Sequence, residues 1–218
     1  MEIKGAIFDM DGLMLDTEKL YNRFWREAAA EYGYAMTYEH ALAIRSMNPL
    51  KGSAILKGFL GEDFPYEEVK ARRRVMMKEY VEKNGVEKKK GLDELLIFLR
   101  DNQYKAAVAT SSNINRTKWY LTSVGVWDYF DKVICGDMVK QGKPEPDIYL
   151  TASKQLELEP EQCIALEDSP AGILSAMRAG CHPIFVPDLD EVDEQTRKRA
   201  EYIVDNLSEV IHLLKKEE

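Results

Sequence analysis

The chain has 218 residues, a formal net charge of −8, 45% hydrophobic residues and 31% charged residues. This composition is ordinary for a globular protein, and the length suits one large domain or a core with an inserted domain. The negative charge disfavours a nucleic-acid partner, because phosphate backbones are bound by basic surfaces. No apolar stretch is long enough to span a bilayer and no signal-peptide pattern follows Met1, so we expect a cytoplasmic protein with no membrane contact.

An apolar strand near the amino terminus ends in an acidic turn. Residues 3–8 are mostly apolar or β-branched, and Asp9-Met10-Asp11-Gly12 follows them directly. In an open α/β sheet, ligands bind at the carboxyl edge of the strands, where this turn falls. Gly12 lets the backbone curl, so that one acidic residue can offer its carbonyl oxygen and the other its carboxylate to the same cation. Taken alone, the segment is equally well explained as an ordinary β-turn, because Asp and Gly dominate turns.

A helical segment follows the acidic turn. Asp16 or Thr17 is a suitable N-cap, and an apolar stripe at four-residue spacing then runs to the glycine at position 33: Leu20, Phe24, Ala28 and Tyr32. Further helices are expected over residues 38–47, 51–60 and 66–83, with no convincing strand between them. We therefore expect residues 17–86 to form an inserted helical domain of the four-helix-bundle type. Two adjacent linkers, near residues 15–18 and 87–91, would let this domain act as a hinged lid.

The remainder of the chain alternates helices and strands. We expect strands at residues 104–109, 132–135, 163–166, 183–186 and 202–204, and helices at residues 92–102, 116–124, 147–156, 171–178 and 208–215. This alternation is typical of a parallel sheet with helices on both faces. The predicted fold class is therefore α/β. Residues 1–16 and 87–218 would form a Rossmann-like, doubly wound parallel sheet core, into which the helical domain is inserted.

Polar residues of complementary character stand at or after the ends of four of these strands. They are Asp9 and Asp11, Thr110 and Ser111, Lys143, and Glu167 and Asp168. The carboxyl ends of parallel strands share one edge of the sheet, so we expect these residues to converge on one pocket. Carboxylates for a hard cation, one ammonium and one hydroxyl form the set that phosphoryl transfer needs, and Mg²⁺ is the favoured ion. Each group taken singly is also explained as a helix cap or a loop charge, but capping does not require opposite charges at separate strand ends.

Four short motifs occur in order at these strand ends. They read F-D-M-D-G at residues 8–12, A-T-S-S at 109–112, G-K-P-E-P-D at 142–147 and L-E-D-S-P-A-G at 166–172. Through them the chain resembles the haloacid dehalogenase (HAD) superfamily, and within it the β-phosphoglucomutase-like phosphatases that carry a helical cap after the first strand. The resemblance covers nearly the whole chain. It implies the α/β core, the inserted cap and Mg²⁺ as cofactor.

The resemblance also implies a role for each motif residue. Asp9 would be the nucleophile that forms a phospho-aspartate. Asp11 would be the general acid for the leaving oxygen and then the general base for water. Lys143 would offset the charge of Asp9 and of the phosphate. The implied phosphate-binding set is Asp9, Met10, Asp11, Thr110, Ser111 and Lys143, and the implied metal ligands are Asp9, Asp11 through its carbonyl oxygen, Asp168, and Glu167 directly or through water.

The implied reaction is Mg²⁺-dependent hydrolysis of a small organic phosphomonoester, such as a sugar phosphate, by a monomer. A sugar-phosphate mutase is the alternative, but Tyr21 stands where such enzymes have a His, and Asn48-Pro49 where they have an Arg that grips phosphate. Arg45 is near enough to substitute for that Arg. A receiver-like domain that accepts phosphate without turnover is a more distant alternative. The substrate contacts expected in the helical domain are Glu18, Tyr21, Arg45 and Asn48.

Overall fold

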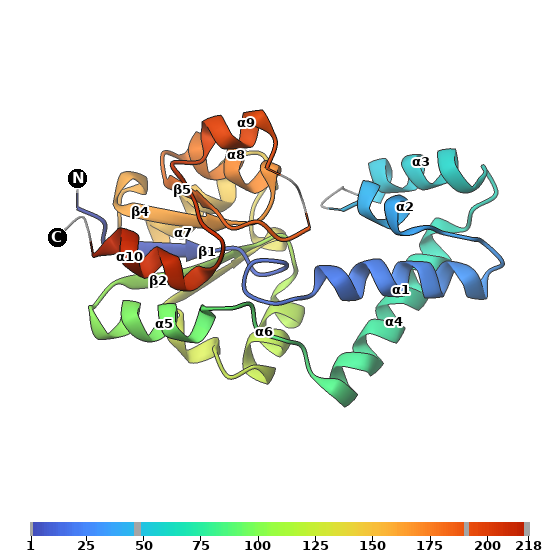
Figure 1. Ribbon diagram of the computed structural model, residues 1–218, viewed down its shortest axis with the longest axis horizontal. Coiled ribbons are helices and arrows are strands. Elements are labelled where there is room, and N and C mark those ends of the chain that lie inside the picture. The colour runs from blue at the N-terminus through green and yellow to red at the C-terminus, as the bar shows by residue number, and fades with distance from the viewer. Residues whose placement is uncertain (1, 46–48, 190–191, 216–218) are drawn as a thin grey trace. The chain divides into compact units, whose positions relative to one another are not determined.

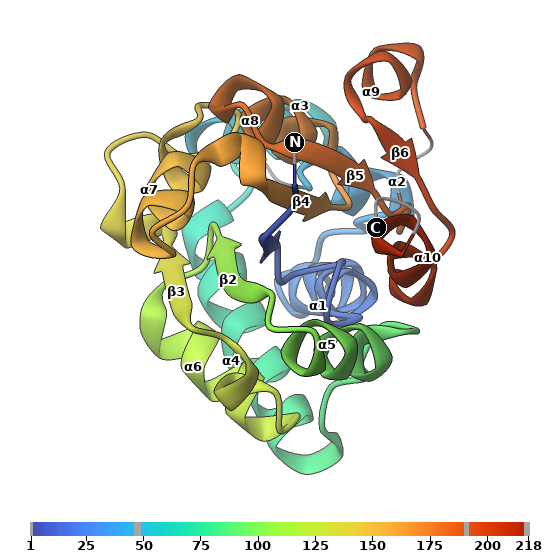
Figure 2. The ribbon, with the colours of Figure 1, turned by 90° about the vertical axis from the view of Figure 1, so that its left-hand side faces the viewer.

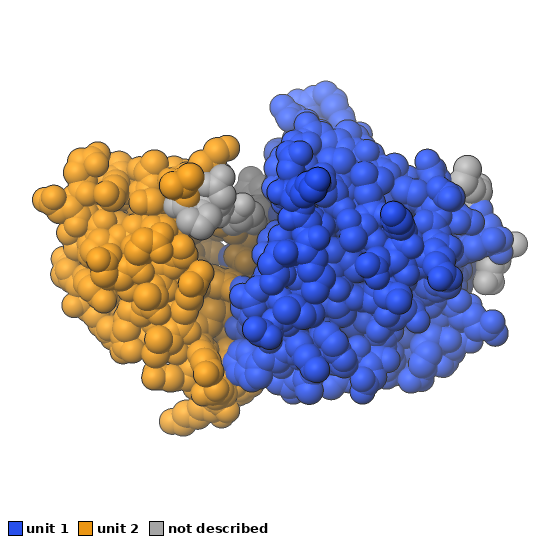
Figure 3. Space-filling view, turned by 180° about the vertical axis from the view of Figure 1, so that it is seen from behind, with its two compact units in different colours: residues 1–16, 87–218 blue, residues 17–86 orange. Residues whose placement is uncertain are grey.

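The chain folds into two compact units. The computed structural model describes residues 2–45, 49–189 and 192–215. Residues 1–16 and 87–218 form one unit, called here the α/β unit, and residues 17–86 form the other, called the helical unit (Figure 3). The helical unit therefore interrupts the α/β unit shortly after its first strand.

A six-stranded parallel sheet forms the centre of the α/β unit (Figure 1). The strands lie in the order β3-β2-β1-β4-β5-β6. Their bounds are β1 Gly5–Phe8, β2 Lys105–Thr110, β3 Lys132–Cys135, β4 Cys163–Glu167, β5 His182–Phe185 and β6 Tyr202–Ile203. Phe8 at the end of β1 is in register with Val108 on β2 and Leu166 on β4. The strand order changes direction around β1, so the carboxyl end of β1 lies where α/β sheets bind ligands.

Helices cover both faces of the sheet. α7 (Asp147–Gln155) and α8 (Pro170–Ala179) lie on one face, and α5 (Leu92–Asp101) and α6 (Ile114–Ser123) lie on the other (Figure 2). The short helices α9 (Glu194–Arg199) and α10 (Val210–Leu214) contact α8 and α5, respectively. Short 3₁₀ turns occur at Trp127–Tyr129, Gly136–Met138, Pro160–Gln162 and Leu207–Glu209. Because both faces are covered, the central strands are apolar runs, and residues 106–109 of β2 are all buried.

Four helices make up the described part of the helical unit. They are α1 (Glu18–Glu31), α2 (Tyr38–Ala43), α3 (Pro49–Leu60) and α4 (Tyr66–Asn84). Their apolar faces meet in one core, which includes Trp25, Ala28, Ala29, Leu56, Phe64 and Val69. The stripe predicted on the first helix buries Phe24, but Tyr32 is 43% exposed because α1 ends before it.

The two chain segments that connect the units are hydrogen-bonded to each other. The amide of Asp16 donates to the carbonyl of Glu87 at 2.9 Å, and the amide of Lys89 donates to the carbonyl of Met14 at 2.9 Å. Between these two bonds, Leu15 forms an antiparallel bridge with the second segment. The helical unit is therefore inserted at a single point of the α/β unit.

The predicted α/β class, with its parallel sheet and alternating helices, is confirmed. Most helices differ from the prediction by one or two residues at their ends, and two differ more. The helix expected over residues 38–47 ends at Ala43, and α9 is not predicted because its sequence E-Q-T-R-K-R has no apolar periodicity. Within the described ranges, no helix has the length and apolar character needed to cross a membrane.

Candidate active site

Asp9 lies at the carboxyl end of β1, the strand between β2 and β4. Its amide donates to the carbonyl of Leu166 at 3.1 Å, which extends the pairing with β4 by one residue. The chain then turns at Gly12, whose φ of 88° is in the left-handed region that favours glycine. The amide of Gly12 donates to the carbonyl of Leu15 at 2.9 Å and closes this turn. Asp9 is thereby fixed at the edge of the sheet and is only 8% exposed.

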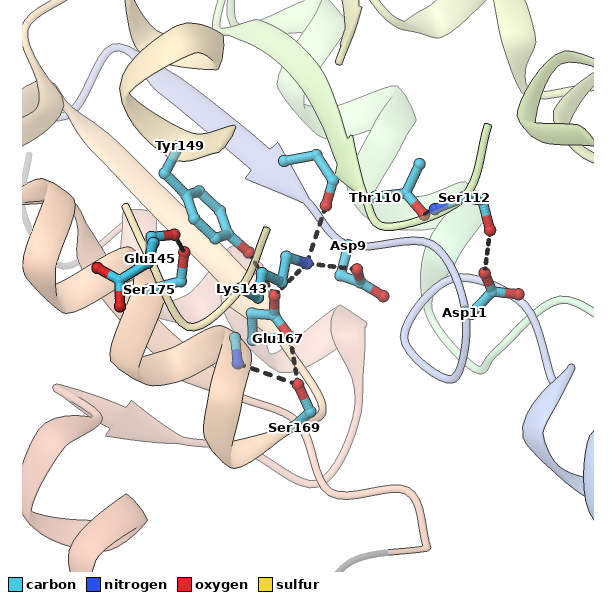
Figure 4. A network of polar contacts seen from close by, with 12 residues as sticks. Asp9, Asp11, Thr110, Ser112, Lys143, Glu145, Tyr149, Glu167, Ser169 and Ser175 are labelled. Atoms are coloured by element: carbon cyan, nitrogen blue, oxygen red, sulfur yellow. Dashed lines mark hydrogen bonds and ion pairs between the residues drawn. The ribbon is translucent and has the colours of Figure 1, made fainter. Parts of the chain in front are cut away.

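Lys143 joins Asp9 to Glu167. Its Nζ atom lies 2.5 Å from Oδ1 of Asp9 and 2.5 Å from Oε1 of Glu167, and it donates to the carbonyl of Ala109 at 2.9 Å (Figure 4). Lys143 comes from the loop after β3, whereas the two carboxylates follow β1 and end β4. The structure thus brings together residues from all four motifs, the second one through the backbone carbonyl of Ala109.

Glu167 is fully buried and is held by two hydroxyl groups. Tyr149 on α7 donates its hydroxyl to Oε1 at 2.5 Å, and Ser169 donates its hydroxyl to Oε2 at 3.2 Å (Figure 4). The Ser169 side chain also caps α8 by accepting the amide of Gly172 at 3.1 Å. Ser169 takes the role of the cap, so Glu167 and Asp168 are not explained as capping residues. Such outer contacts fix the orientation of a potential metal ligand.

Asp9, Glu167 and Asp168 form an acidic group that suits a cation. One carboxylate oxygen from each residue lies within 4.8 Å of the other two, and all three residues are buried. Oxygen donors are what Mg²⁺ takes, with water and substrate oxygens completing its octahedron. Three buried carboxylates beside the single ammonium of Lys143 leave an excess of negative charge, which a divalent cation would neutralise. The donor set therefore fits the predicted ion. The Asp11 carboxylate is not in this group, so a contact of Asp11 with the ion would use its backbone carbonyl.

The clustered charges shift the pKa values of Asp9 and Lys143. Burial raises the pKa of Asp9 to about 7, an effect that Lys143 opposes and Glu167 reinforces. For Lys143, burial disfavours the charged form, but attraction to Asp9 and Glu167 outweighs it and raises the pKa of its ammonium above the ordinary value. Lys143 therefore stays positively charged, whereas Asp9 needs a second positive charge nearby to be fully ionised at neutral pH.

Thr110 and Ser111 stand at the end of β2. Thr110 is 1% exposed and its Oγ1 accepts the amide of Ser112 at 3.1 Å, whereas Ser111 is exposed. Neither caps the following helix, because the side chain of Asn113 is the N-cap of α6. The capping explanation that the sequence allows for these two residues is therefore wrong. Thr110 ends β2, the strand next to β1, and the role of both residues in phosphate binding stays a prediction.

Met10 offers only its backbone to the site. Its side chain has no exposed surface, and its carbonyl accepts the amides of Met14 and Leu15 at 3.1 Å each. A phosphate contact at this position would therefore use the backbone amide.

The carboxylate of Asp11 has its own set of partners. Ser112 donates its hydroxyl to Oδ2 at 2.9 Å (Figure 4), and Arg116 on α6 donates from Nη2 to Oδ1 at 2.6 Å. Arg116 also donates from Nη1 to the Ser112 hydroxyl at 2.8 Å. Sequence reasoning misses Arg116 and Tyr149, because each is a single residue on an amphipathic helix and only the folded chain shows what it touches. Ser112 closes the A-T-S-S motif, which is the one signal that points to it.

Three of the four predicted substrate contacts fall in the described part of the helical unit. Nε of Arg45 lies 3.2 Å from Oε2 of Glu18, and the two side chains are 5% and 15% exposed. The guanidinium of Arg73 lies 4.6 Å from the ring centre of Tyr21. Asn48 lies outside the described residues. Glu18, Tyr21 and Arg45 thus have partners within the helical unit itself, and their role as substrate contacts stays a prediction.

A family model matches most of the chain. Residues 6–186 match the haloacid dehalogenase-like hydrolase family. This range contains the four motifs and all the clustered residues described above. The chain therefore belongs to the haloacid dehalogenase-like hydrolases, and the resemblance found from the motifs is confirmed.

Individual relatives are similar over most of their length. The chain is 33% identical over 187 residues to the phosphorylated carbohydrates phosphatase of Thermotoga maritima, with 84% of each chain covered. It is 31% identical over 201 residues to hexitol phosphatase A of Escherichia coli, with 88% of this chain and 90% of the relative covered. The crystal structure of β-phosphoglucomutase from Clostridium difficile is similar with a TM-score of 0.78 and 24% identity, over 99% of this chain and 98% of that one. This last likeness shows a shared fold.

Proposed function

We propose that the protein is a Mg²⁺-dependent phosphatase that hydrolyses small phosphomonoesters of the sugar-phosphate class. The observation that carries this proposal is the position of Lys143, whose ammonium lies 2.5 Å from carboxylate oxygens of both Asp9 and Glu167. It gives a nucleophile at the end of the central strand a fixed positive charge beside it. Membership of a hydrolase family supports turnover over the receiver-like alternative.

In the first step, an oxygen of the Asp9 carboxylate attacks the phosphorus of the ester. A bond forms between this oxygen and phosphorus while the bond from phosphorus to the ester oxygen breaks. The carboxylic acid of Asp11 gives its proton to the departing oxygen, which leaves as an alcohol. Lys143, the Thr110 hydroxyl and backbone amides at the strand ends stabilise the charge on the phosphoryl oxygens. The step ends with phospho-aspartate at Asp9 and an ionised Asp11.

In the second step, water attacks the phosphorus of the phospho-aspartate. The Asp11 carboxylate takes a proton from this water as the new oxygen–phosphorus bond forms, and the bond between phosphorus and Asp9 breaks. Inorganic phosphate leaves, Asp9 is again a carboxylate and Asp11 is again protonated. The two steps sum to ester plus water giving alcohol plus phosphate.

Asp9 and Asp168, together with the backbone carbonyl of Asp11, would hold Mg²⁺ directly. The bound ion supplies positive charge that keeps Asp9 ionised and offsets the charge of the phosphate. Glu167 is already bound by Lys143, Tyr149 and Ser169, which favours a contact with the ion through water. The acidic group supports the assignments of Asp9, Glu167 and Asp168, and the family resemblance supports that of the Asp11 carbonyl.

Specificity is proposed to reside in the helical unit. The two relatives described above are named for phosphorylated carbohydrates and for hexitol phosphates, which supports a polyhydroxy leaving group. Such a group is recognised by paired donors and acceptors, which Glu18 and Arg45 provide, with Tyr21 and Asn48 as further candidates. The monomeric state and the cytoplasmic location stay predictions.

The test is phosphate release from a panel of sugar phosphates, hexitol phosphates, nucleotides and phosphoglycolate, with Mg²⁺ or with EDTA. We expect turnover on a sugar or hexitol phosphate with Mg²⁺, and no turnover with EDTA or with Asp9→Asn. A quenched reaction should show phosphate on the peptide that contains Asp9. A stoichiometric burst without turnover would replace the proposal by the receiver-like alternative, and interconversion of glucose phosphate isomers would replace it by the mutase. No release from any member of the panel would also overturn it.

A further inference from the structure

Three hydrogen bonds form a closed ring around the Asp11 carboxylate. Nη2 of Arg116 donates to Oδ1 at 2.6 Å, and the hydroxyl of Ser112 donates to Oδ2 at 2.9 Å. Nη1 of Arg116 donates to the same hydroxyl at 2.8 Å. A donor thus reaches each carboxylate oxygen, and the guanidinium also holds the hydroxyl that donates to Oδ2. This arrangement fixes the plane of the Asp11 carboxylate relative to α6.

Arg116 is itself fixed by the local structure of α6. Its amide donates to the N-cap side chain of Asn113 at 3.0 Å. Its guanidinium carbon lies 5.1 Å from the ring centre of Tyr120, which is 2% exposed. A planar guanidinium on an aromatic ring keeps its orientation better than a lysine ammonium does. The helix cap thus holds the Arg116 backbone, and the Tyr120 ring packs against its guanidinium.

The ring around Asp11 is built differently from the cluster around Asp9. Lys143 bridges Asp9 and Glu167 with one ammonium, which is a point charge. Arg116 uses the two ends of its guanidinium fork on different partners, Asp11 and Ser112, and the Arg116 and Asp11 side chains are 30% and 18% exposed. Partial shielding from water strengthens such a charge-assisted bond relative to an open surface pair. The two aspartates of the first motif are therefore served by two separate cations.

We propose that Arg116 is a positioning residue that holds Asp11 for proton transfer to and from the reacting oxygens. The inference rests on the proposed function. The proton moves from the Asp11 carboxyl to the ester oxygen as the phosphorus–oxygen bond breaks, and from water back to Asp11 in the second step. Arg116 gives and takes no proton. Its contribution is orientation, whose loss costs about 10- to 100-fold in rate when a catalytic group is misplaced.

The leaving group separates positioning from general structural support. A 4-nitrophenolate ion leaves without a proton, whereas a sugar alkoxide needs one. For Arg116→Ala we expect kcat on the sugar phosphate that the wild type accepts to fall about 10- to 100-fold, with a much smaller change in KM. With 4-nitrophenyl phosphate, the pre-steady-state burst of nitrophenolate should keep its wild-type rate. Steady-state turnover on that substrate should fall, because water still needs Asp11 as a base.

Four further variants complete the test. Arg116→Ala combined with Asp11→Asn should be no slower than Asp11→Asn alone, because both changes remove the same function. Arg116→Lys restores the charge without the fork and should recover part of kcat on the sugar phosphate. Lys118→Ala removes an exposed cation from the same helix and should keep wild-type rates on both substrates. Thermal melts of all variants report whether each is folded.

The outcomes are distinguishable. The inference is wrong, and the phosphatase proposal stands, if Arg116→Ala slows the nitrophenolate burst as much as it slows sugar-phosphate turnover. The same holds if the double variant is slower than Asp11→Asn alone. If the wild type releases phosphate from neither substrate, the proposed function falls and the inference falls with it. If Arg116→Ala does not fold, Ser112→Ala replaces it and must show the same dependence on the leaving group, or the inference is wrong.

Discussion

Gly172 lies directly against Glu167: a Cβ atom at position 172 would overlap the Glu167 carboxylate. We expect Gly172→Ala to displace that carboxylate from Tyr149 and Ser169, because a buried side chain without room must move. The expected cost is about 1–3 kcal/mol in the free energy of unfolding, together with weaker Mg²⁺ binding. Urea denaturation and a Mg²⁺ titration measure the two effects.

The matched control for this change is Gly58→Ala. Gly58 lies inside α3, and an added Cβ there meets nothing within 4 Å. Alanine should therefore stabilise the helix by about 0.5–1 kcal/mol and leave Mg²⁺ binding unchanged. Unaltered stability and Mg²⁺ binding in Gly172→Ala would show that Glu167 is not held in the way the structure describes.

Removing the Lys143 ammonium should destabilise the protein. Lys143→Met leaves the buried carboxylates of Asp9 and Glu167 without the cation between them, and the Lys143 side chain is 7% exposed. Breaking a buried pair in this way costs about 3–5 kcal/mol, and phosphatase activity should be lost. Lys140→Met, in the same loop but exposed, is the control. Equal unfolding midpoints for the two variants would contradict the buried ion-pair assignment.

The raised pKa of Asp9 gives the metal-free protein a specific pH dependence. In the unfolded chain the carboxyl loses its proton near its ordinary pKa of 3.8, whereas burial raises the pKa of the folded form to about 7. Between these two pH values the folded state binds more protons than the unfolded state does. The contribution of Asp9 to the free energy of unfolding therefore falls as the pH rises. Asp9→Asn removes this titration. In EDTA, Asp9→Asn should therefore gain stability relative to the wild type between about pH 4 and about pH 7.

Urea denaturation of both proteins near each end of that pH range provides the measurement. Adding Mg²⁺ should restore the stability of the wild type at the higher pH, because a cation favours the ionised carboxylate. If the difference in stability between the two proteins does not change with pH, the pKa of Asp9 is not raised in the folded protein.

The helical unit should depend on Phe24. Phe24 is 4% exposed, and its ring centre lies 5.4 Å from that of Tyr80. This contact joins α1 to α4. Phe24→Ala leaves a cavity and should cost about 3–5 kcal/mol in the free energy of unfolding. Phe59→Ala removes a ring that is 52% exposed and should cost much less. Denaturation followed by circular dichroism compares the two, and a small loss for Phe24→Ala would contradict its burial between α1 and α4.

The parallel sheet is predictable from the sequence because strands that are covered on both faces are continuous apolar runs. β2 and β4 are recognised in this way, to within a residue at each end. Helix ends are less predictable, since they depend on the packing of the neighbouring chain. Tyr32 continues the spacing of the α1 stripe but lies beyond the last turn, and α9 is held by a cap at Asp193 without an apolar face of its own.

The residues at the strand ends are predictable because topology alone brings the carboxyl ends of parallel strands to one edge. The contacts that support them are not. Tyr149 occupies a core position on α7, and nothing in its sequence neighbourhood shows that its hydroxyl reaches Glu167. Arg116 occupies a position on α6 that suits any polar residue, and its bond to Asp11 spans 105 residues of sequence. Such pairs are defined by distances in space, which spacing along the chain does not encode.

Because the connecting segments are hydrogen-bonded to each other at Asp16 and Glu87, residues 17–86 form an insertion that begins and ends at the same place. An insertion whose two ends are held together can be lengthened, shortened or replaced without altering the register of any strand in the sheet. Evolution, or a protein engineer, can therefore change the helical unit while leaving the sheet and the residues at its strand ends unchanged.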